Sequence, residues 1–150
     1  MTAIIAAADG FLIAVLWFDL MFDVQVVRHR GAPAVPEDVL DSISAYYRRV
    51  TTTASPMGRL VALTMLVLVG ALVAQAVRGD VPVWVSVVSF VAAGTGIGLA
   101  GVRVFGRARR LGARTDPPEV RSELARSIFR DHLVCLAGMT TLLAVQLAAA

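Results

Sequence analysis

Apolar and polar residues follow one another in long blocks along this chain. Four apolar blocks are each about as long as an α-helix must be to cross a hydrocarbon core of roughly 30 Å. They predict membrane spans at about residues 3–27, 58–78, 81–103 and 127–149. Because only Gly79 and Asp80 separate the second block from the third, these two spans should form an antiparallel hairpin.

The polar stretch between the first two spans contains its own helical pattern over residues 36–50. It opens with a proline and two acids, apolar residues then recur at helical spacing, and two arginines close it. We expect a short amphipathic helix that lies along the membrane surface in the first cytoplasmic loop. Tyr46 and Tyr47 should then sit near the lipid headgroups.

The stretch 103–116 is rich in arginine and is predicted to be a polar connection. Thr115, Asp116 and Pro117 at its end form a helix start signal, so a long helix should begin there and continue into the fourth span. The predicted fold is therefore all-α: an integral membrane four-helix bundle with an interfacial helix, forming one domain over residues 1–150.

Composition supports this prediction, since 57% of the residues are hydrophobic against about 45–50% in soluble domains. The net charge of +3 alone is also compatible with nucleic-acid binding. However, the basic residues are all arginines that flank the apolar blocks, which is typical of membrane topology signals. We therefore expect the lipid bilayer, and no nucleic acid, as a partner.

The arginines are distributed asymmetrically. The two long connections carry twelve of them, not counting Arg130 just inside the fourth span, and the opposite side carries only Arg78. The positive-inside rule then places both long connections in the cytoplasm and both termini outside. The sequence predicts a multi-pass protein of the cell inner (plasma) membrane.

Three acids lie in the first span: Asp9, Asp19 and Asp23. At 100° per residue they share a sector of about 80° of the helix surface. An acid that faces lipid at the middle of a span costs about 2.5–3.5 kcal/mol on insertion scales. This stripe should therefore face the interior of the bundle.

Asp19 and Asp23 lie toward the cytoplasmic end of the first span, level with charged residues of the other spans. We expect these to form one polar layer, which comprises Asp19, Asp23, Arg59, Arg103, Arg130, Asp131 and His132. The arginines can neutralise the carboxylates and clamp the helices together. Alternatively, the layer is a polar pocket that binds a small ligand or ion, or relays protons. Asp9 lies nearer the outside, where Gln75 or a snorkelling Arg78 is its expected partner.

Two further patterns concern the later spans. His132, Cys135 and Met139 share one helical face and form a soft-ligand set that can suit copper, although Cys and Met in apolar helices usually serve packing. Gly94 and Gly98 form a GxxxG spacing for close helix approach, either within the monomer or in a homodimer. Since four spans are few for a transporter, a conduit would need a homo-oligomer or a larger membrane complex.

Two sequence stretches carry a family resemblance. Ile43–Arg49 (ISAYYRR) leads to Pro56 and the second span, and Arg130-Asp131-His132-Leu133 leads into the last. With the apolar first helix and the hairpin, this layout resembles the small four-span bacterial membrane proteins related to anthrone oxygenases, over most of the chain. The resemblance implies oxidation of an aromatic polyketide-like substrate without an obvious cofactor. Trp17–Gln25 (WFDLMFDVQ) departs from it, because two acids stand in a helix that is mostly apolar in such proteins.

No nucleophile elbow and no phosphate-binding glycine loop occurs in the sequence. The leading functional prediction is a small polytopic membrane protein of binding, transport-related or accessory-subunit type, with the Asp/Arg/His layer as its working or stabilising feature. The alternative is a membrane-embedded oxidoreductase of the anthrone-oxygenase-like type.

Overall fold

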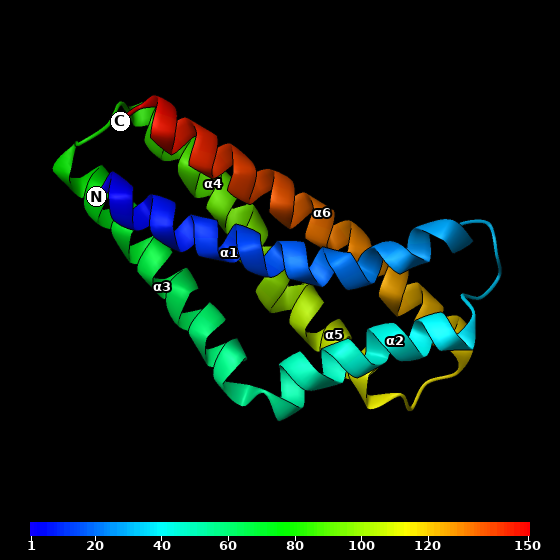
Figure 1. Cartoon of the computed structure of the whole chain (residues 1–150). Coiled ribbons are helices and arrows are strands. Elements are labelled where there is room, and N and C mark those ends of the chain that lie inside the picture. Colours follow the sequence, from blue (N-terminus) through cyan, green and yellow to red (C-terminus); the bar gives the residue numbers. More distant parts are fainter.

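The computed structural model describes residues 1–150, with every side chain except that of Ser55. Most of the chain is helical, and it forms four long helical segments and one short one (Figure 1). In chain order the elements are α1 (Thr2–Asp23), the 3₁₀ turn η1 (Val24–His29), α2 (Glu37–Arg48), the π turn η2 (Arg49–Thr53), α3 (Ser55–Arg78), α4 (Val83–Leu99), the π turn η3 (Ala100–Val104), α5 (Phe105–Ala113) and α6 (Pro118–Ala148). The all-α class is thereby confirmed.

Four helical segments are long and apolar enough to cross a membrane: Thr2–His29, Pro56–Arg78, Val83–Ala113 and Pro118–Ala148. The third runs on through Ala113, so most of the arginine-rich stretch 103–116 is helical, and its role as the polar connection between the third and fourth spans stays a prediction. The helix continues because α5 is amphipathic: Ala108 and Leu111 are buried while the arginines take the exposed side.

The long segments pack side by side with α1 between α3 and α6, and with α6 between α1 and α4 (Figure 1). The N- and C-termini lie at the same end as the α3–α4 connection, and α2 lies at the opposite end. At that connection Gly79 ends α3 in the left-handed conformation (φ 67°), which a residue without Cβ adopts at little cost. The two helices then run antiparallel and diverge.

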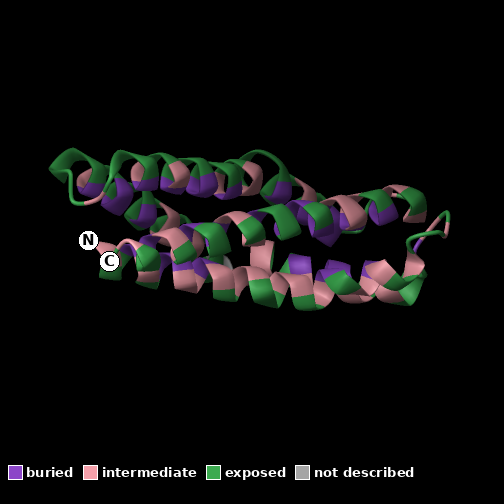
Figure 2. Ribbon diagram, turned by 90° about the horizontal axis from the view of Figure 1, so that it is seen from above, coloured by how far each residue is buried: buried purple, intermediate pink, exposed green. Residues whose placement is uncertain are grey.

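Buried positions gather on the sides of the helices that face one another (Figure 2). One apolar core joins α1, α3, α4 and α6 near the termini. A second core joins α2, α5 and α6 at the other end, and it contains Leu40, Ile43 and Tyr47 of α2. The apolar face of α2 is thus accounted for by packing within the protein, and its position at a membrane surface stays a prediction.

Glycines bring α4 and α6 close together, but Gly94 and Gly98 take no part in this contact within the monomer, and their role in a homodimer stays a prediction. Gly94 and Gly98 are exposed, and a Cβ on either would meet no atom within 4 Å among the described residues. Instead Gly138 of α6 lies against α4, where a Cβ would stand 3.0 Å from the carbonyl oxygen of Ala92. Gly96 of α4 receives the end of the Met139 side chain.

Candidate functional site

The three acids of α1 point into the bundle, as their shared sector predicts. Asp9 and Asp23 are completely buried, and the Asp19 side chain is 15% exposed. Asp23 ends α1 at the level where α2 and α6 pack against it. One otherwise apolar face of α1 therefore places the carboxylates of Asp19 and Asp23 at the second core.

Asp23 is held between two side chains from other helices. The Tyr47 hydroxyl of α2 donates a hydrogen bond of 2.6 Å to Asp23 Oδ1. The His132 imidazole of α6 places Nδ1 2.6 Å from Asp23 Oδ2. Such short bonds to a carboxylate are typical of charge-assisted hydrogen bonds, so Asp23 ties three helices together at one point.

Asp19 completes a cluster around the same imidazole. Its Oδ2 lies 3.8 Å from His132 Nε2, and the Tyr46 hydroxyl donates a 2.7 Å hydrogen bond to its Oδ1. Tyr46 in turn stacks on Phe22 with ring centroids 4.1 Å apart and meets Tyr47 edge to face. The two ring nitrogens of His132 therefore face two different carboxylates. We call these five residues the carboxylate–imidazole cluster: Asp19, Asp23, Tyr46, Tyr47 and His132.

The two tyrosines act as hydrogen-bond donors in this cluster. Burial, followed by the negative charge of the nearby carboxylates, raises the pKa of both the Tyr46 and the Tyr47 hydroxyl above the usual range. A phenol whose pKa is raised keeps its proton at neutral pH. Both hydroxyls can therefore donate to Asp19 and Asp23 throughout the physiological range.

A second set of charges adjoins the cluster at Asp131, the residue before His132. Arg107 Nη1 lies 2.9 Å from Asp131 Oδ2, and Arg103 Nη2 lies 3.4 Å from Oδ1. Arg107 also donates a hydrogen bond to Ser127. Because these arginine side chains are 46% (Arg103) and 32% (Arg107) exposed, water shares in their stabilisation.

The predicted layer is therefore formed only in part. The structure brings Asp19, Asp23 and His132 together and sets Asp131 with Arg103 beside them. Arg59 and Arg130 are exposed, and no ion pair among the described side chains involves either. The arginine partners that were predicted for Asp19 and Asp23 are replaced by tyrosine hydroxyls and imidazole. Extending an arginine side chain into water costs less free energy than burying its charge. A tyrosine on the apolar face of α2, in contrast, can be buried and still supply a hydroxyl donor.

Sequence reasoning missed Tyr46, Tyr47 and Arg107 as members of the site. A signal was present for Tyr47, because it follows Leu40 and Ile43 at helical spacing on the apolar face of α2. That spacing predicts burial and not a place among headgroups. Arg107 was missed because it lies in the stretch predicted to be a polar connection between the spans.

At the other end of the bundle neither expected partner forms a hydrogen bond with Asp9. Gln75 and Gln146 exchange two side-chain hydrogen bonds of 2.9 and 3.0 Å, and Gln146 also donates to Ser89. Arg78 is exposed. Neither carboxyl oxygen of Asp9 has a hydrogen-bond partner among the described residues. The predicted pairing of Asp9 with Gln75 or Arg78 is therefore wrong.

His132, Cys135 and Met139 do share the buried face of α6, but each has a different partner. His132 contacts the two carboxylates, Cys135 Sγ donates to the Gly96 carbonyl oxygen at 3.5 Å, and Met139 packs on Gly96. Within the described part of the chain, no group of three or more His, Cys, Asp or Glu side chains is arranged to hold a metal ion. The geometry gives the copper interpretation no support.

Comparisons with known proteins found no match, because no family model, no curated protein and no solved structure matches the chain.

Proposed function

We propose that this chain is a multi-pass membrane protein of binding, transport-related or accessory-subunit type, and that His132 of the carboxylate–imidazole cluster takes up and releases a proton as its working step. One observation carries the proposal. A single buried imidazole faces two carboxylates from one helix and is backed by two tyrosines from another. Ionisable residues inside membrane helices commonly mark ion pathways and proton relays.

Insertion in a bilayer is supported by the outer surface of the long helices. Large apolar side chains point outward along them, among them Leu66 (70% exposed) and Val77 (82% exposed) of α3. In water, contiguous apolar surface of this extent is costly, whereas hydrocarbon solvates it. The same helices have the length and composition of membrane spans.

The balance of charges in the layer favours a proton at His132. Three carboxylates, Asp19, Asp23 and Asp131, face two guanidinium groups and one imidazole. The layer is neutral when the imidazole is protonated and carries one uncompensated negative charge when it is not. A buried net charge is expensive, so proton binding at His132 changes the attraction between α1 and α6.

His132 is also the group whose charge is suited to change. Arginine keeps its charge in proteins, whereas histidine gains and loses a proton near physiological pH. A clamp of arginines and carboxylates would keep its charges throughout the neutral pH range. A clamp with an imidazole at its centre responds to a proton, and this response is what a transport-related or accessory subunit can use.

The proposed orientation follows from the arginines. The cluster lies at the end of the bundle that carries α2 and both arginine-rich connections, which the positive-inside rule assigns to the cytoplasm. The proton would therefore exchange with the cytoplasmic side of a bacterial plasma membrane. Both termini would lie outside.

The proposal is tested by ¹⁵N-histidine NMR of the full chain in lipid nanodiscs. The chain has two histidines, so a His29→Gln background leaves the signal of His132 alone. We expect His132 to change its protonation state between about pH 5 and 9, with a midpoint that Asp23→Asn shifts. Asp80→Asn, which changes an exposed carboxylate in the α3–α4 connection, serves as the matched control. A His132 spectrum that is constant over this range would overturn the proposal.

The oxidoreductase alternative has one geometric feature in its favour. Asp23 fixes Nδ1 of His132, which is how a carboxylate orients a histidine that acts as a general base. It predicts oxygen consumption with an anthrone-type substrate that His132→Gln abolishes. Turnover that does not depend on His132, or no turnover, would leave the proton-binding proposal as the better account.

A further inference from the structure

A basic hollow lies at the end of the bundle that carries α2, and none of its lining residues belongs to the carboxylate–imidazole cluster. It has a volume of about 510 Å³ and is lined by Ala45, Arg48, Arg49, Thr53, Ala54 and Arg114. These residues come from the end of α2, from η2 with the residue after it, and from the end of α5. Three of the six are arginines and none is acidic.

Arg48 and Arg49 have no acidic partner among the described side chains. Arg114 donates a hydrogen bond of 2.7 Å to the backbone oxygen of Asp41 and lies 3.8 Å from its carboxylate. That carboxylate is held more closely by Arg121, at 2.7 Å. The hydrogen bond from Arg121 also lowers the pKa of Asp41, so its single charge is already engaged. The hollow therefore carries an excess of positive charge.

Two helix ends contribute backbone around the hollow. The carbonyl groups at the end of α2 would repel a negative charge, because they form the negative end of the helix dipole. Two threonine hydroxyls donate hydrogen bonds to carbonyl oxygens at this end: Thr51 donates to the Tyr47 oxygen at 2.7 Å, and Thr53 donates to the Arg49 oxygen at 3.1 Å. Arg114 ends α5 in the left-handed conformation (φ 57°), where glycine or asparagine is usual. An arginine is thus present at a position whose backbone favours a smaller residue.

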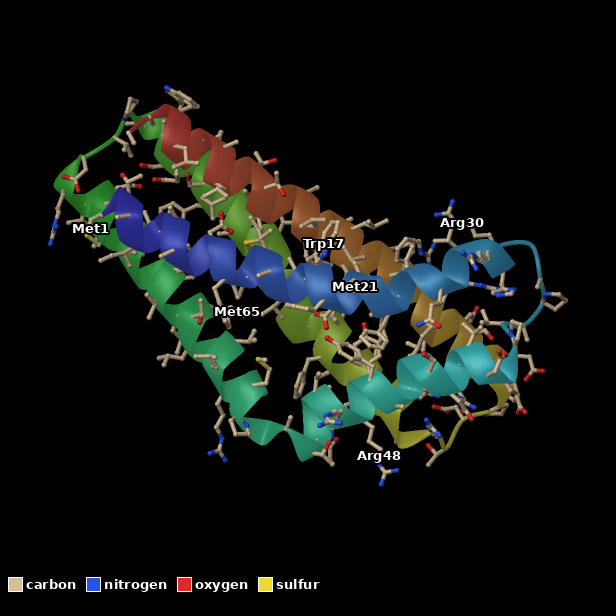
Figure 3. All side chains as sticks on the ribbon, viewed as in Figure 1. Met1, Trp17, Met21, Arg30, Arg48 and Met65 are labelled. Atoms are coloured by element: carbon tan, nitrogen blue, oxygen red, sulfur yellow. The ribbon has the colours of Figure 1, made fainter. Side chains whose placement is uncertain are left out.

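The hollow also lies next to the proposed cytoplasmic end of a membrane span. The chain passes from η2 directly into α3, one of the four helices able to cross a membrane. Figure 3 shows Arg48 projecting outward from the end of α2, while Arg30 projects from the opposite edge of the molecule. Basic groups next to the cytoplasmic end of a span are where anionic headgroups are recognised.

We propose that Arg48, Arg49 and Arg114 form a binding site for a phosphoryl group. The planar guanidinium fork matches phosphate oxygens with two parallel hydrogen bonds, and three such groups around one hollow can surround a phosphate. The phosphate belongs either to an anionic lipid headgroup or to a soluble phosphate, and the chemistry of recognition is the same. This site contains no residue of the carboxylate–imidazole cluster, so it stands or falls independently of the proton proposal.

The test uses the full chain, purified in a neutral detergent. Native mass spectrometry counts retained phosphatidylglycerol, with phosphatidylcholine as the zwitterionic comparison, and calorimetry measures the binding of inorganic phosphate. We expect one phosphatidylglycerol per chain, bound more tightly than phosphatidylcholine. Arg48→Gln and Arg114→Gln should each weaken binding about fivefold, the loss of roughly 1 kcal/mol per arginine. Arg30→Gln removes the same charge from an exposed position on the other edge and should leave binding unchanged.

Each result decides between outcomes. Binding of inorganic phosphate that also depends on Arg48 and Arg114, with equal retention of the two lipids, would identify a soluble phosphate as the ligand. Retention that favours phosphatidylglycerol and depends on these residues would identify a lipid headgroup. If the Arg48, Arg114 and Arg30 variants all behave alike, or if neither phosphatidylglycerol nor inorganic phosphate binds, the site does not exist. Circular dichroism shows that each variant is folded.

Discussion

At the residue scale, burial raises the pKa of both Tyr46 and Tyr47. They are the two tyrosines of the chain, and each donates to a carboxylate. Their pKa values in the folded protein are raised, first by burial and then by the carboxylates. A raised pKa stabilises the fold at every pH below the unfolded value of about 10, and this contribution is lost as the pH rises beyond it.

We therefore expect phenolate absorbance to appear only when alkali unfolds the protein, well above the pH of about 10 at which free tyrosine ionises. An ultraviolet pH titration, followed in parallel by circular dichroism, measures both events. Tyr47→Phe should lower the stability of the folded chain by about 1–3 kcal/mol at neutral pH, because Asp23 loses a buried donor. Reversible ionisation of both tyrosines near pH 10 in the folded protein would contradict this expectation. The chain unfolded in denaturant supplies the reference titration.

Two buried carboxylates of one helix should respond oppositely to the same substitution. Asp9 has no hydrogen-bond partner among the described residues, whereas Asp23 has two. Asp9→Leu should raise the thermal stability in detergent by about 1–3 kcal/mol, because an unsatisfied polar group is replaced by an apolar one of similar shape. Asp23→Leu should lower it by about 3–5 kcal/mol, because His132 loses its partner. Equal effects of the two substitutions would show that Asp9 is as well partnered as Asp23.

At the element scale, the position of α2 depends on its contact with α5. A Cβ at Gly112 of α5 would lie 2.7 Å from the backbone nitrogen of Arg48, closer than atoms normally approach. This contact fixes the position of the segment 46–49. Its tyrosines belong to the cluster, and its arginines line the basic hollow. The cluster and the hollow therefore share one piece of backbone as support.

Gly112→Ala should destabilise the chain by about 1–3 kcal/mol, since the added methyl group must push two backbones apart. Gly106→Ala in the same helix is the control. A Cβ there meets nothing within 4 Å, and alanine favours a helix by about 0.5–1 kcal/mol relative to glycine, so stability should hold or rise. Thermal unfolding in detergent measures both variants. If Gly112→Ala is as stable as Gly106→Ala, α2 does not pack on α5 as closely as the structure has it.

At the scale of the whole molecule, the even number of long helical segments places both termini at one end. If the arginine-rich connections lie in the cytoplasm, as we propose, a bacterial alkaline phosphatase fused after Ala150 should be active, because the enzyme needs the periplasm. The same reporter fused after Ala113, at the end of the third segment, should be inactive. The reversed pattern of activity would invert the proposed orientation, and with it the side from which the proton reaches His132.

Much of the architecture is predictable from the sequence because it depends on local properties. Runs of apolar residues predict the long helices, and 100° per residue places Asp9, Asp19 and Asp23 on one inward face. The start signal before Pro118 locates the last helix. The continuation of the third helix through α5 to Ala113 was not predicted, because the arginines on the exposed side of α5 mask its buried side when composition alone is considered.

The composition and order of residues by themselves determined that this chain forms long apolar helices. They also determined that the acids of the first helix face inward. Both results follow from one segment at a time, because helix periodicity and the cost of exposing charge to lipid are properties of each segment. Only the tertiary structure decided which groups meet those acids. Tyr46, Tyr47 and His132 reach Asp19 and Asp23 because α2 folds back under α1 and packs on α5 and α6. Which side chains meet across a bundle depends on how the helices pack and on which long side chains can reach water. Neither property can be predicted from the spacing of residues along one helix.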